Sequence, residues 1–214
     1  MSFYEITKFS CEVPVQEVLN RMGMPGGRAG EEEGMLLEVK QELVKYKQGF
    51  WENMEPLALI SSGEIESAGQ KILVAACVTT LGSRMEQWIS QLFECGEIFA
   101  AMVMDAASDV YLFQMQKELS CGLSLLCREQ HAGIEGRILI PEDLPMEVQK
   151  QIAAMTHAKQ YGITLNDAYV FSPLKTVSLL FRLGEKGKFC IAHDCSRCQR
   201  TDCMRKVCMS QRSE

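Results

Sequence analysis

The feature that most constrains the fold is a long, mostly apolar helical stretch at residues 97–129. Its alanines are small and its methionines Met102, Met104 and Met115 adapt in shape, so the stretch is suited to close packing. We therefore expect this helix to lie against other helices within the protein core.

The segments around this stretch are shorter and do not alternate regularly. Apolar residues at helical spacing predict further helices at residues 14–22, 31–47, 82–96 and 145–161. Short runs rich in apolar and β-branched residues predict strands at residues 57–61, 72–80, 136–140 and 177–183. The strands are too scattered for βαβ units, so we predict an α+β protein. Residues 1–185 are expected to form one domain, with packed helices around a mostly antiparallel sheet.

Five of the ten cysteines lie in the last 25 residues of the chain. They are Cys190, Cys195, Cys198, Cys203 and Cys208, and the last four follow the pattern CxxCxxxxCxxxxC. A two-residue spacer allows two thiolates to reach one metal ion, and thiolates bind zinc, Cu(I) and iron–sulfur clusters. We expect residues 186–214 to be an appendage that binds zinc or an iron–sulfur cluster, with Cys208 or Cys190 as the fourth ligand. Free thiols and disulfides are the alternatives.

The other cysteines and the N-terminus bear on the cellular compartment. Cys77, Cys95, Cys121 and Cys127 lie among apolar residues, where a reduced cysteine behaves as a small buried hydrophobe. Residues 1–5 lack the basic and apolar regions of a secretory signal. No apolar run reaches the roughly eighteen residues that span a bilayer. We therefore expect a soluble, cytoplasmic protein without a membrane partner.

Charge is distributed unevenly along the chain. Residues 186–214 contain seven basic and three acidic residues, a net charge of +4, whereas the whole chain carries −6. The rest of the chain therefore carries about −10. An acidic body argues against a general nucleic-acid-binding protein, because such proteins present basic surfaces to the phosphate backbone.

Six short segments stand out by their order along the chain. They read EVLNRMG at 17–23, TTLG at 79–82, MDAA at 104–107, DLPMEVQ at 143–149, YGITLN at 161–166 and SPLKTVS at 172–178. This ordered set resembles the activation domain of the cobalamin-dependent methionine synthases. It is most similar to their stand-alone bacterial form, in which a terminal CxxCxxxxC is also common.

The resemblance implies a role in repairing a corrinoid cofactor. Domains of this family bind S-adenosylmethionine and dock over the cobalamin of a partner when its cobalt has become inactive cob(II)alamin. One electron from a flavoprotein or ferredoxin and a methyl group from S-adenosylmethionine then restore methylcobalamin. The cobalamin, carried by the partner methyltransferase, supplies the difficult chemistry, and the domain supplies position and charge.

The resemblance also points to ligand-binding residues. The family has an arginine followed by a Pro-Gly-Tyr loop, and Arg137 stands here in the arginine's place. It is followed by Ile-Leu-Ile-Pro-Glu, so Pro141 replaces a segment where glycine permits close approach of the backbone. Asp105, Lys175 and Ser178, which belong to the matching segments or lie on the adjoining strand, are the other candidates.

One acidic position of the family is not reproduced. The carboxylate expected to pair with the ammonium group of the ligand falls at Phe113 in this sequence. Asp109 and Glu118, about one helical turn to either side, are the residues expected to replace it.

Two functional hypotheses follow from these residues. The first is an accessory subunit, rather than an independent enzyme, that supports remethylation of cob(II)alamin on a methionine synthase or related corrinoid methyltransferase. The second is an iron–sulfur or zinc docking or redox module that keeps the fold but has lost S-adenosylmethionine binding. Ligand binding at residues 137–142 favours the first hypothesis, and an occluded loop favours the second.

Overall fold

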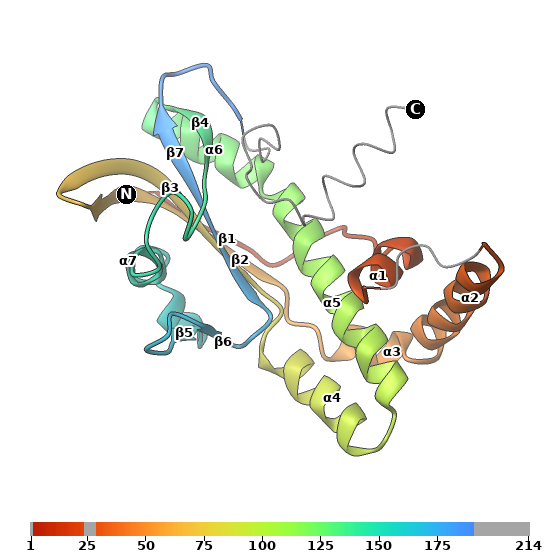
Figure 1. Ribbon diagram of the computed structural model, residues 1–214. Coiled ribbons are helices and arrows are strands. Elements are labelled where there is room, and N and C mark those ends of the chain that lie inside the picture. Colours follow the sequence, from red (N-terminus) through yellow and green to blue (C-terminus); the bar gives the residue numbers. More distant parts are fainter. Residues whose placement is uncertain (1, 24–28, 191–214) are drawn as a thin grey trace.

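A five-stranded antiparallel sheet crosses the centre of the molecule (Figure 1). The computed structural model of the chain describes residues 2–23 and 29–190. In spatial order the strands are β1 (Phe3–Ile6), β2 (Leu57–Ser67), β3 (Gln70–Thr80), β7 (Thr176–Gly184) and β4 (Gly133–Ile138). Because β7 lies between β3 and β4, the sheet joins the two halves of the chain. A second, two-stranded sheet consists of β5 (Thr164–Leu165) and β6 (Phe171–Ser172).

The β2–β3 hairpin is the longest paired unit of the sheet. Its two strands pair along eleven residues each, and the turn consists of Ala68 and Gly69. Both turn residues have positive φ, 51° and 75°. This is the type I′ geometry that matches the right-handed twist of the flanking strands.

Alternate side chains of the sheet enter two different cores. On one face, Leu59 and Leu180 pack with residues of α7 (Val148–Met155). On the opposite face, Ile60 packs with residues of α6 (Ser120–Gln130). Figure 1 shows the sheet between α7 on one side and the α5–α6 pair on the other. This alternation is the period-2 pattern of a sheet that is covered on both faces.

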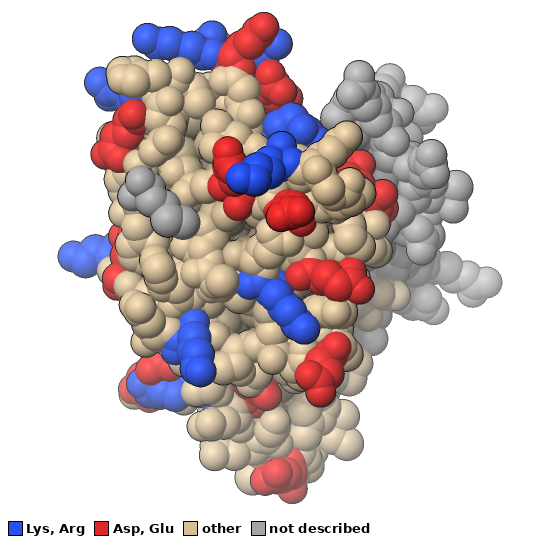
Figure 2. All heavy atoms as spheres, turned by 90° about the vertical axis from the view of Figure 1, so that its left-hand side faces the viewer, with Lys and Arg blue, Asp and Glu red and all other residues tan. Residues whose placement is uncertain are grey.

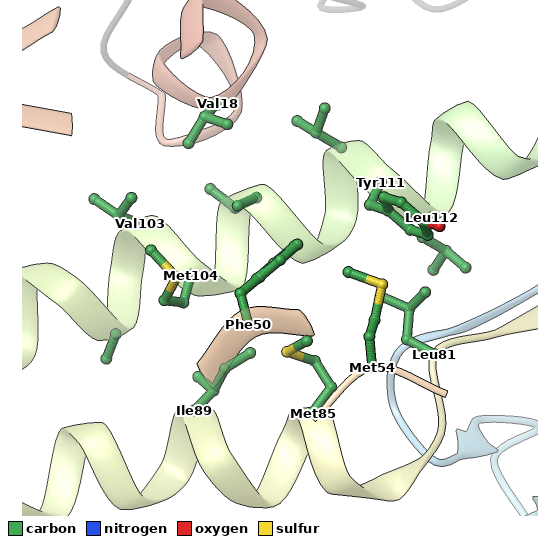
Figure 3. Packing of buried hydrophobic residues seen from close by; sticks show 14 of the residues in the cluster. Val18, Phe50, Met54, Leu81, Met85, Ile89, Val103, Met104, Tyr111 and Leu112 are labelled. Atoms are coloured by element: carbon green, nitrogen blue, oxygen red, sulfur yellow. The ribbon is translucent and has the colours of Figure 1, made fainter. Parts of the chain in front are cut away.

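A third core surrounds α5, which is the central helix of the molecule. In Figure 3, Val18 approaches α5 from one side, and Met85 and Ile89 approach it from the other. The helices of this layer are α1 (Val15–Arg21), α2 (Ala29–Lys45), α3 (Lys47–Glu52), α4 (Ser83–Glu94) and α5 (Ile98–Glu118).

The α5–α6 run, Ile98–Gln130, is long and apolar enough to cross a membrane by length and composition alone. Within the run's apolar window, however, 61% of the residues are buried inside the protein. Met104 and Met115 are fully buried there. The run is therefore a core helix, as the composition of residues 97–129 predicts.

The α+β class and the mostly antiparallel sheet are confirmed, but some element boundaries differ from the predictions. The helix predicted at residues 97–129 is divided at Leu119 into α5 and α6. The helix predicted at 145–161 is shorter, because α7 ends at Met155 and the positive φ of His157 separates it from a 3-10 turn, Ala158–Tyr161. Both predicted helices lie where helical structure is found, but each was wrongly predicted as one continuous helix.

The cysteine predictions are confirmed in part. Cys77 and Cys127 are buried and reduced, as expected. Cys95 and Cys121 are exposed, so the prediction that they are buried was wrong. Cys95 caps the C-terminus of α4, where the helix has already left the core.

Of the five predicted metal ligands, only Cys190 is among the described residues. Cys195, Cys198, Cys203 and Cys208 lie outside the described residues. Cys190, the last described residue, is exposed, and its amide donates to the Ile134 carbonyl at 3.0 Å. Among residues 2–23 and 29–190, no three His, Cys, Asp or Glu side chains gather in a way that could hold a metal ion.

The surface on the α7 side carries both signs of charge. Figure 2 shows basic and acidic side chains interspersed there over a largely uncharged surface. The described residues of this face form no continuous basic area of the kind that contacts a phosphate backbone.

Candidate functional site

Lys175 occupies the turn that leads into β7, and its backbone is fixed by the adjacent strand. The Leu81 amide donates to the Lys175 carbonyl at 3.0 Å. Next to it, the hydroxyls of Thr80 and Thr176 lie 2.8 Å apart across the β3–β7 pair. The Leu174 amide on the other side donates to the Glu86 carboxylate at 2.8 Å. These contacts hold the lysine side chain toward α5.

The Lys175 ammonium lies among oxygen atoms of α5. It is 2.7 Å from Asp105 Oδ1 and 2.7 Å from Asp109 Oδ1, and it donates to the Asp105 carbonyl at 3.2 Å. Asp105 and Asp109 are four residues apart and therefore lie on one face of the helix. Only 12% of the Lys175 side chain is exposed, so this is a shielded ion pair.

Arg21, in the last turn of α1, completes a chain of four charges. Its Nε and Nη2 donate to Asp109 Oδ2 at 2.8 and 2.6 Å. Its guanidinium also lies over the Phe113 ring, 5.4 Å from the ring centroid. Asp109 thus accepts from two cations, and the network connects α1, α5 and the start of β7.

Two adjoining cavities lie at this network. One, of about 430 Å³, is lined by Arg21, Met22, Phe93, Met102, Asp105, Ala106 and Asp109. The other, of about 280 Å³, is lined by Glu86, Ile89, Ser90, Phe93, Asp105, Asp109, Leu174 and Lys175. Because both are lined by Phe93, Asp105 and Asp109, they form one groove beside α4 and α5, which we call the α4–α5 groove.

Arg137 is half-buried on β4 and belongs to a different region. It pairs with Phe181 of β7 and shares the α6-facing side of the sheet with Cys77. Burial raises the pKa of the Cys77 thiol well above its ordinary value, and the positive charge of Arg137 opposes that rise. Phe181 is six positions along β7 from Lys175, roughly 20 Å at the usual rise of a strand. Arg137 therefore does not join the Lys175 network.

Ser178 and Pro141 lie apart from Lys175 as well. Ser178 alternates with Val177 and Leu179 along β7, so it points to the α7 side, where its hydroxyl donates to Gln149 Oε1 at 2.7 Å. Pro141 follows a cis peptide bond after Ile140. Of the five candidates predicted from the sequence, only Asp105 and Lys175 contact each other. The other three, Arg137, Pro141 and Ser178, lie away from this pair.

The loop after β4 closes on itself through Asp143. The Leu139 amide donates to Asp143 Oδ2 at 2.8 Å, and the Asp143 and Leu144 amides donate to the Leu139 carbonyl at 2.8 and 3.3 Å. The backbone groups at this end of the loop are satisfied within the chain. Neither cavity of the α4–α5 groove is lined by residues of this loop.

The two carboxylates expected to replace the acidic residue at Phe113 are engaged in the fold. Asp109 is held by Arg21 and Lys175, as described above. Glu118 accepts from the Ser10 amide at 3.1 and 3.0 Å with its two oxygens. Both carboxylates therefore have internal partners.

Sequence reasoning missed Arg21 and Phe93, which are central to the groove. Arg21 lies within one of the six ordered segments, and Phe93 belongs to the apolar stripe of the helix predicted at 82–96. Phe93 lies at the edge of that stripe and is 45% exposed, so it lines the groove rather than the core. The stripe alone does not distinguish these two positions.

The sequence and the fold were compared with those of known proteins. No protein-family model and no curated protein matches the sequence. Among solved structures, the chain is similar to the crystal structure of the MetH reactivation domain bound to AdoHcy. The TM-score is 0.58, at 11% sequence identity, over 85% of this chain and 78% of that chain. The two proteins share a fold.

The shared fold confirms the structural side of the resemblance. The likeness extends over most of both chains, as expected from six segments that are spread from residue 17 to residue 178. At 11% identity it concerns the fold, and the MetH domain's AdoHcy is a ligand of that protein.

Proposed function

We propose that this protein is a stand-alone reactivation partner of a cobalamin-dependent methionine synthase or a related corrinoid methyltransferase. The observation that carries the proposal is the fold shared with the MetH reactivation domain over 85% of the chain. The six ordered segments support it independently, because they were assigned from sequence alone. The protein acts as an accessory subunit in the cytoplasm, and the cobalamin belongs to its partner.

Reductive remethylation requires a methyl donor, and S-adenosylmethionine supplies a methyl group bound to a positively charged sulfur. Arg137 is the residue of this chain suited to the ligand's carboxylate, because a guanidinium binds carboxylates through two parallel hydrogen bonds. The loop after Arg137 is less suited to binding the ligand, because the Leu139 amide already donates to the Asp143 carboxylate. We therefore infer weak binding, with Arg137 providing the main polar contact and the loop that contains Pro141 contributing less.

Calorimetric titration with S-adenosylmethionine tests the ligand part of the proposal. We expect a dissociation constant in the millimolar range and loss of binding in Arg137→Ala. Arg182→Ala is the matched control, because Arg182 is exposed on β7 and alternates with Phe181 to the other face of the sheet. Absence of binding at millimolar ligand, or equal binding by Arg137→Ala, contradicts this assignment.

A spectroscopic assay tests the partnership. The protein is mixed with a cob(II)alamin-loaded methyltransferase, a reductant and S-adenosylmethionine, and the visible spectrum is followed. We expect methylcobalamin to reappear only when all components are present. A stand-alone partner must find its target by diffusion, so the rate is expected to fall with added salt. If the cob(II)alamin spectrum persists, reactivation is not the function.

The closure of the loop by Asp143 supports a second candidate. In this second candidate function, the protein has the same fold but does not bind S-adenosylmethionine. It acts as a docking or redox module for a corrinoid protein. Co-purification with the corrinoid protein, together with no calorimetric signal for S-adenosylmethionine, would favour this candidate. An electron-donating flavoprotein or ferredoxin would then be a second partner.

We further propose that the Cys-rich tail binds zinc or an iron–sulfur cluster through Cys195, Cys198 and Cys203, with Cys208 or Cys190 as the fourth ligand. Four thiolates would complete a structural zinc site, whereas a cluster would supply an electron carrier. Anaerobic purification and metal analysis provide the test. We expect about one equivalent of zinc, or iron in cluster stoichiometry, and loss of it in Cys198→Ser but not in Cys95→Ser. Less than a tenth of an equivalent in the unaltered protein rules the site out.

A further inference from the structure

The α4–α5 groove has the size of a small-molecule site and lies apart from Arg137 and the loop after β4. Its two cavities measure about 430 and 280 Å³ and adjoin at Phe93, Asp105 and Asp109. Ligand pockets commonly have volumes of about 300–1,000 Å³. The groove therefore offers room for a ligand, independently of the function proposed above.

Asp105 and Arg21 are exposed charged groups of the groove, at 51% and 47% of their side chains, and Arg21 is already paired with Asp109. The ammonium of Lys175 is held by Asp105 and Asp109, and Arg21 donates twice to Asp109. Both oxygens of Asp109 are therefore engaged. Asp105 differs from Asp109, because its side chain is 51% exposed against 17% for Asp109.

Only Oδ1 of Asp105 takes part in the ion pair with Lys175. Among the described residues, no donor contacts Oδ2 of Asp105, since the other contacts of this residue go to its backbone carbonyl. Glu86 adds a second carboxylate to the groove, so two cations face three carboxylates and the lining has a net charge of −1. This balance favours a cationic ligand over an anionic one.

The walls beside Asp105 are apolar and exposed. Phe93 lines both cavities and is 45% exposed, and Met102 and Leu174 are 38% and 63% exposed. An aromatic face next to a carboxylate attracts organic cations through both the charge and the ring quadrupole. A methionine thioether adds a polarizable surface that adapts to ligand shape.

We propose that the α4–α5 groove binds a small organic cation, an ammonium group carried on an apolar body. The cation lies between Asp105 Oδ2 and the ring of Phe93, and the apolar body lies along Met102 or Leu174. Lys175 does not touch the ligand; it orients Asp105 by holding Oδ1.

Benzyltrimethylammonium is a suitable probe, because it combines a permanent cation with an apolar ring. Titration of the whole protein, followed by NMR or calorimetry, is expected to give saturable binding in the millimolar range. Benzyl alcohol and phenylacetate, which keep the ring but are neutral and anionic, are expected to bind at least tenfold more weakly. Equal binding of the three probes, or no saturation by the ammonium, overturns the proposal.

Two variants locate the probe. Phe93→Leu keeps an apolar side chain at an exposed position and is expected to weaken binding about two- to fivefold through loss of the cation–ring attraction. Asp105→Asn is expected to weaken binding about tenfold or more, since it removes the charge that the cation faces. Asp167→Asn, at an exposed aspartate that lines neither cavity, is expected to leave binding unchanged. If Phe93→Leu and Asp105→Asn both bind the probe as the unaltered protein does, the cation lies elsewhere and the proposal is wrong.

The test is separate from that of the reactivation function. Arg137→Ala is expected to retain the probe, because Arg137 lines neither cavity. If the unaltered protein binds the probe but not S-adenosylmethionine, only the first proposal is contradicted. The opposite result contradicts the cation site alone.

Discussion

The Cys11 thiol donates to the Glu118 carboxylate at 3.4 Å, across 107 residues of the chain. The same carboxylate accepts from the Ser10 amide, so the segment between β1 and α1 is fastened to the end of α5. Burial, the hydrogen bond to Glu118 and the nearby negative charge together raise the pKa of Cys11 to about 12. A thiol in this position stays protonated where an ordinary cysteine ionises.

The reactivity of the cysteines should follow this difference. At pH 8.5 we expect iodoacetamide to modify the exposed Cys95 and Cys121 first, and Cys11 and Cys77 much more slowly, because the thiolate is the nucleophile. Time-resolved alkylation followed by peptide mass spectrometry gives the order. Modification of Cys11 as fast as Cys95 would show that its thiol is not shielded.

Stability at high pH should also depend on Cys11. Its pKa is about 9 in the unfolded chain and about 12 in the folded protein, so protonation stabilises the fold below pH 9. This contribution is lost progressively as the pH rises from 9 toward 12. We expect the free energy of unfolding in urea to fall more steeply between pH 8 and 10.5 in the unaltered protein than in Cys11→Ala. Parallel pH profiles for the two proteins would contradict the assigned shift.

The Lys175 ion pairs should contribute more to stability than a surface pair does. Lys175→Met leaves Asp109 with Arg21 alone and removes the partner of Asp105 Oδ1, which we expect to cost about 2–4 kcal/mol. Lys71→Met is the matched control. Its partner is Glu64, both side chains are more than half exposed, and the expected change is within about 1 kcal/mol. Urea unfolding measures both, and equal losses would mean that the shielding of Lys175 has no energetic effect.

Gly133 should be the least replaceable glycine of β4. A Cβ at this position would lie 2.1 Å from the Glu185 carbonyl oxygen and 2.5 Å from that of Lys188, and neither backbone atom can rotate away. We expect Gly133→Ala to destabilise the protein by about 2–4 kcal/mol or to detach residues 185–190 from β4. Gly136→Ala, on the same strand with nothing within 4 Å of its Cβ, should change the unfolding free energy by less than about 1 kcal/mol. Hydrogen exchange at the Ile134 and Cys190 amides would report detachment directly.

The sequence predicted the long elements of the fold because their patterns are local. Most apolar residues of the runs at 97–129 and 72–80 are buried as expected, although Leu73, Ile98, Met102 and Leu125 are exposed. Strand β1 (Phe3–Ile6) was missed, since four residues with alternating exposure give too short a pattern. The second half of β2 was missed because Ser61, Ser62 and Gly63 resemble a turn, although their register with β3 is uninterrupted.

The site was less predictable than the fold because its residues meet across long stretches of chain. Lys175 and Asp105 were both proposed from sequence, but their contact spans 70 residues and depends on where β7 enters the sheet. Arg137 and Ser178 lie on adjacent strands and yet point to opposite faces. Neighbouring residues of a strand point to opposite faces of the sheet, so a shift of one residue moves a side chain to the other face. The spacing of motifs in the sequence does not show which face each residue occupies.

The position of β7 between β3 and β4 has a consequence for how the protein is made. During synthesis, the β2–β3 hairpin leaves the ribosome about a hundred residues before β7 does. Until β7 has been made, the edge of β3 that pairs with it stays without hydrogen-bond partners. An unpaired edge of β-branched residues can capture a strand from another nascent chain. Ribosome-bound chains in which β7 is still inside the exit tunnel should therefore need chaperones, whereas chains in which residue 184 has left the tunnel should close the sheet and release them.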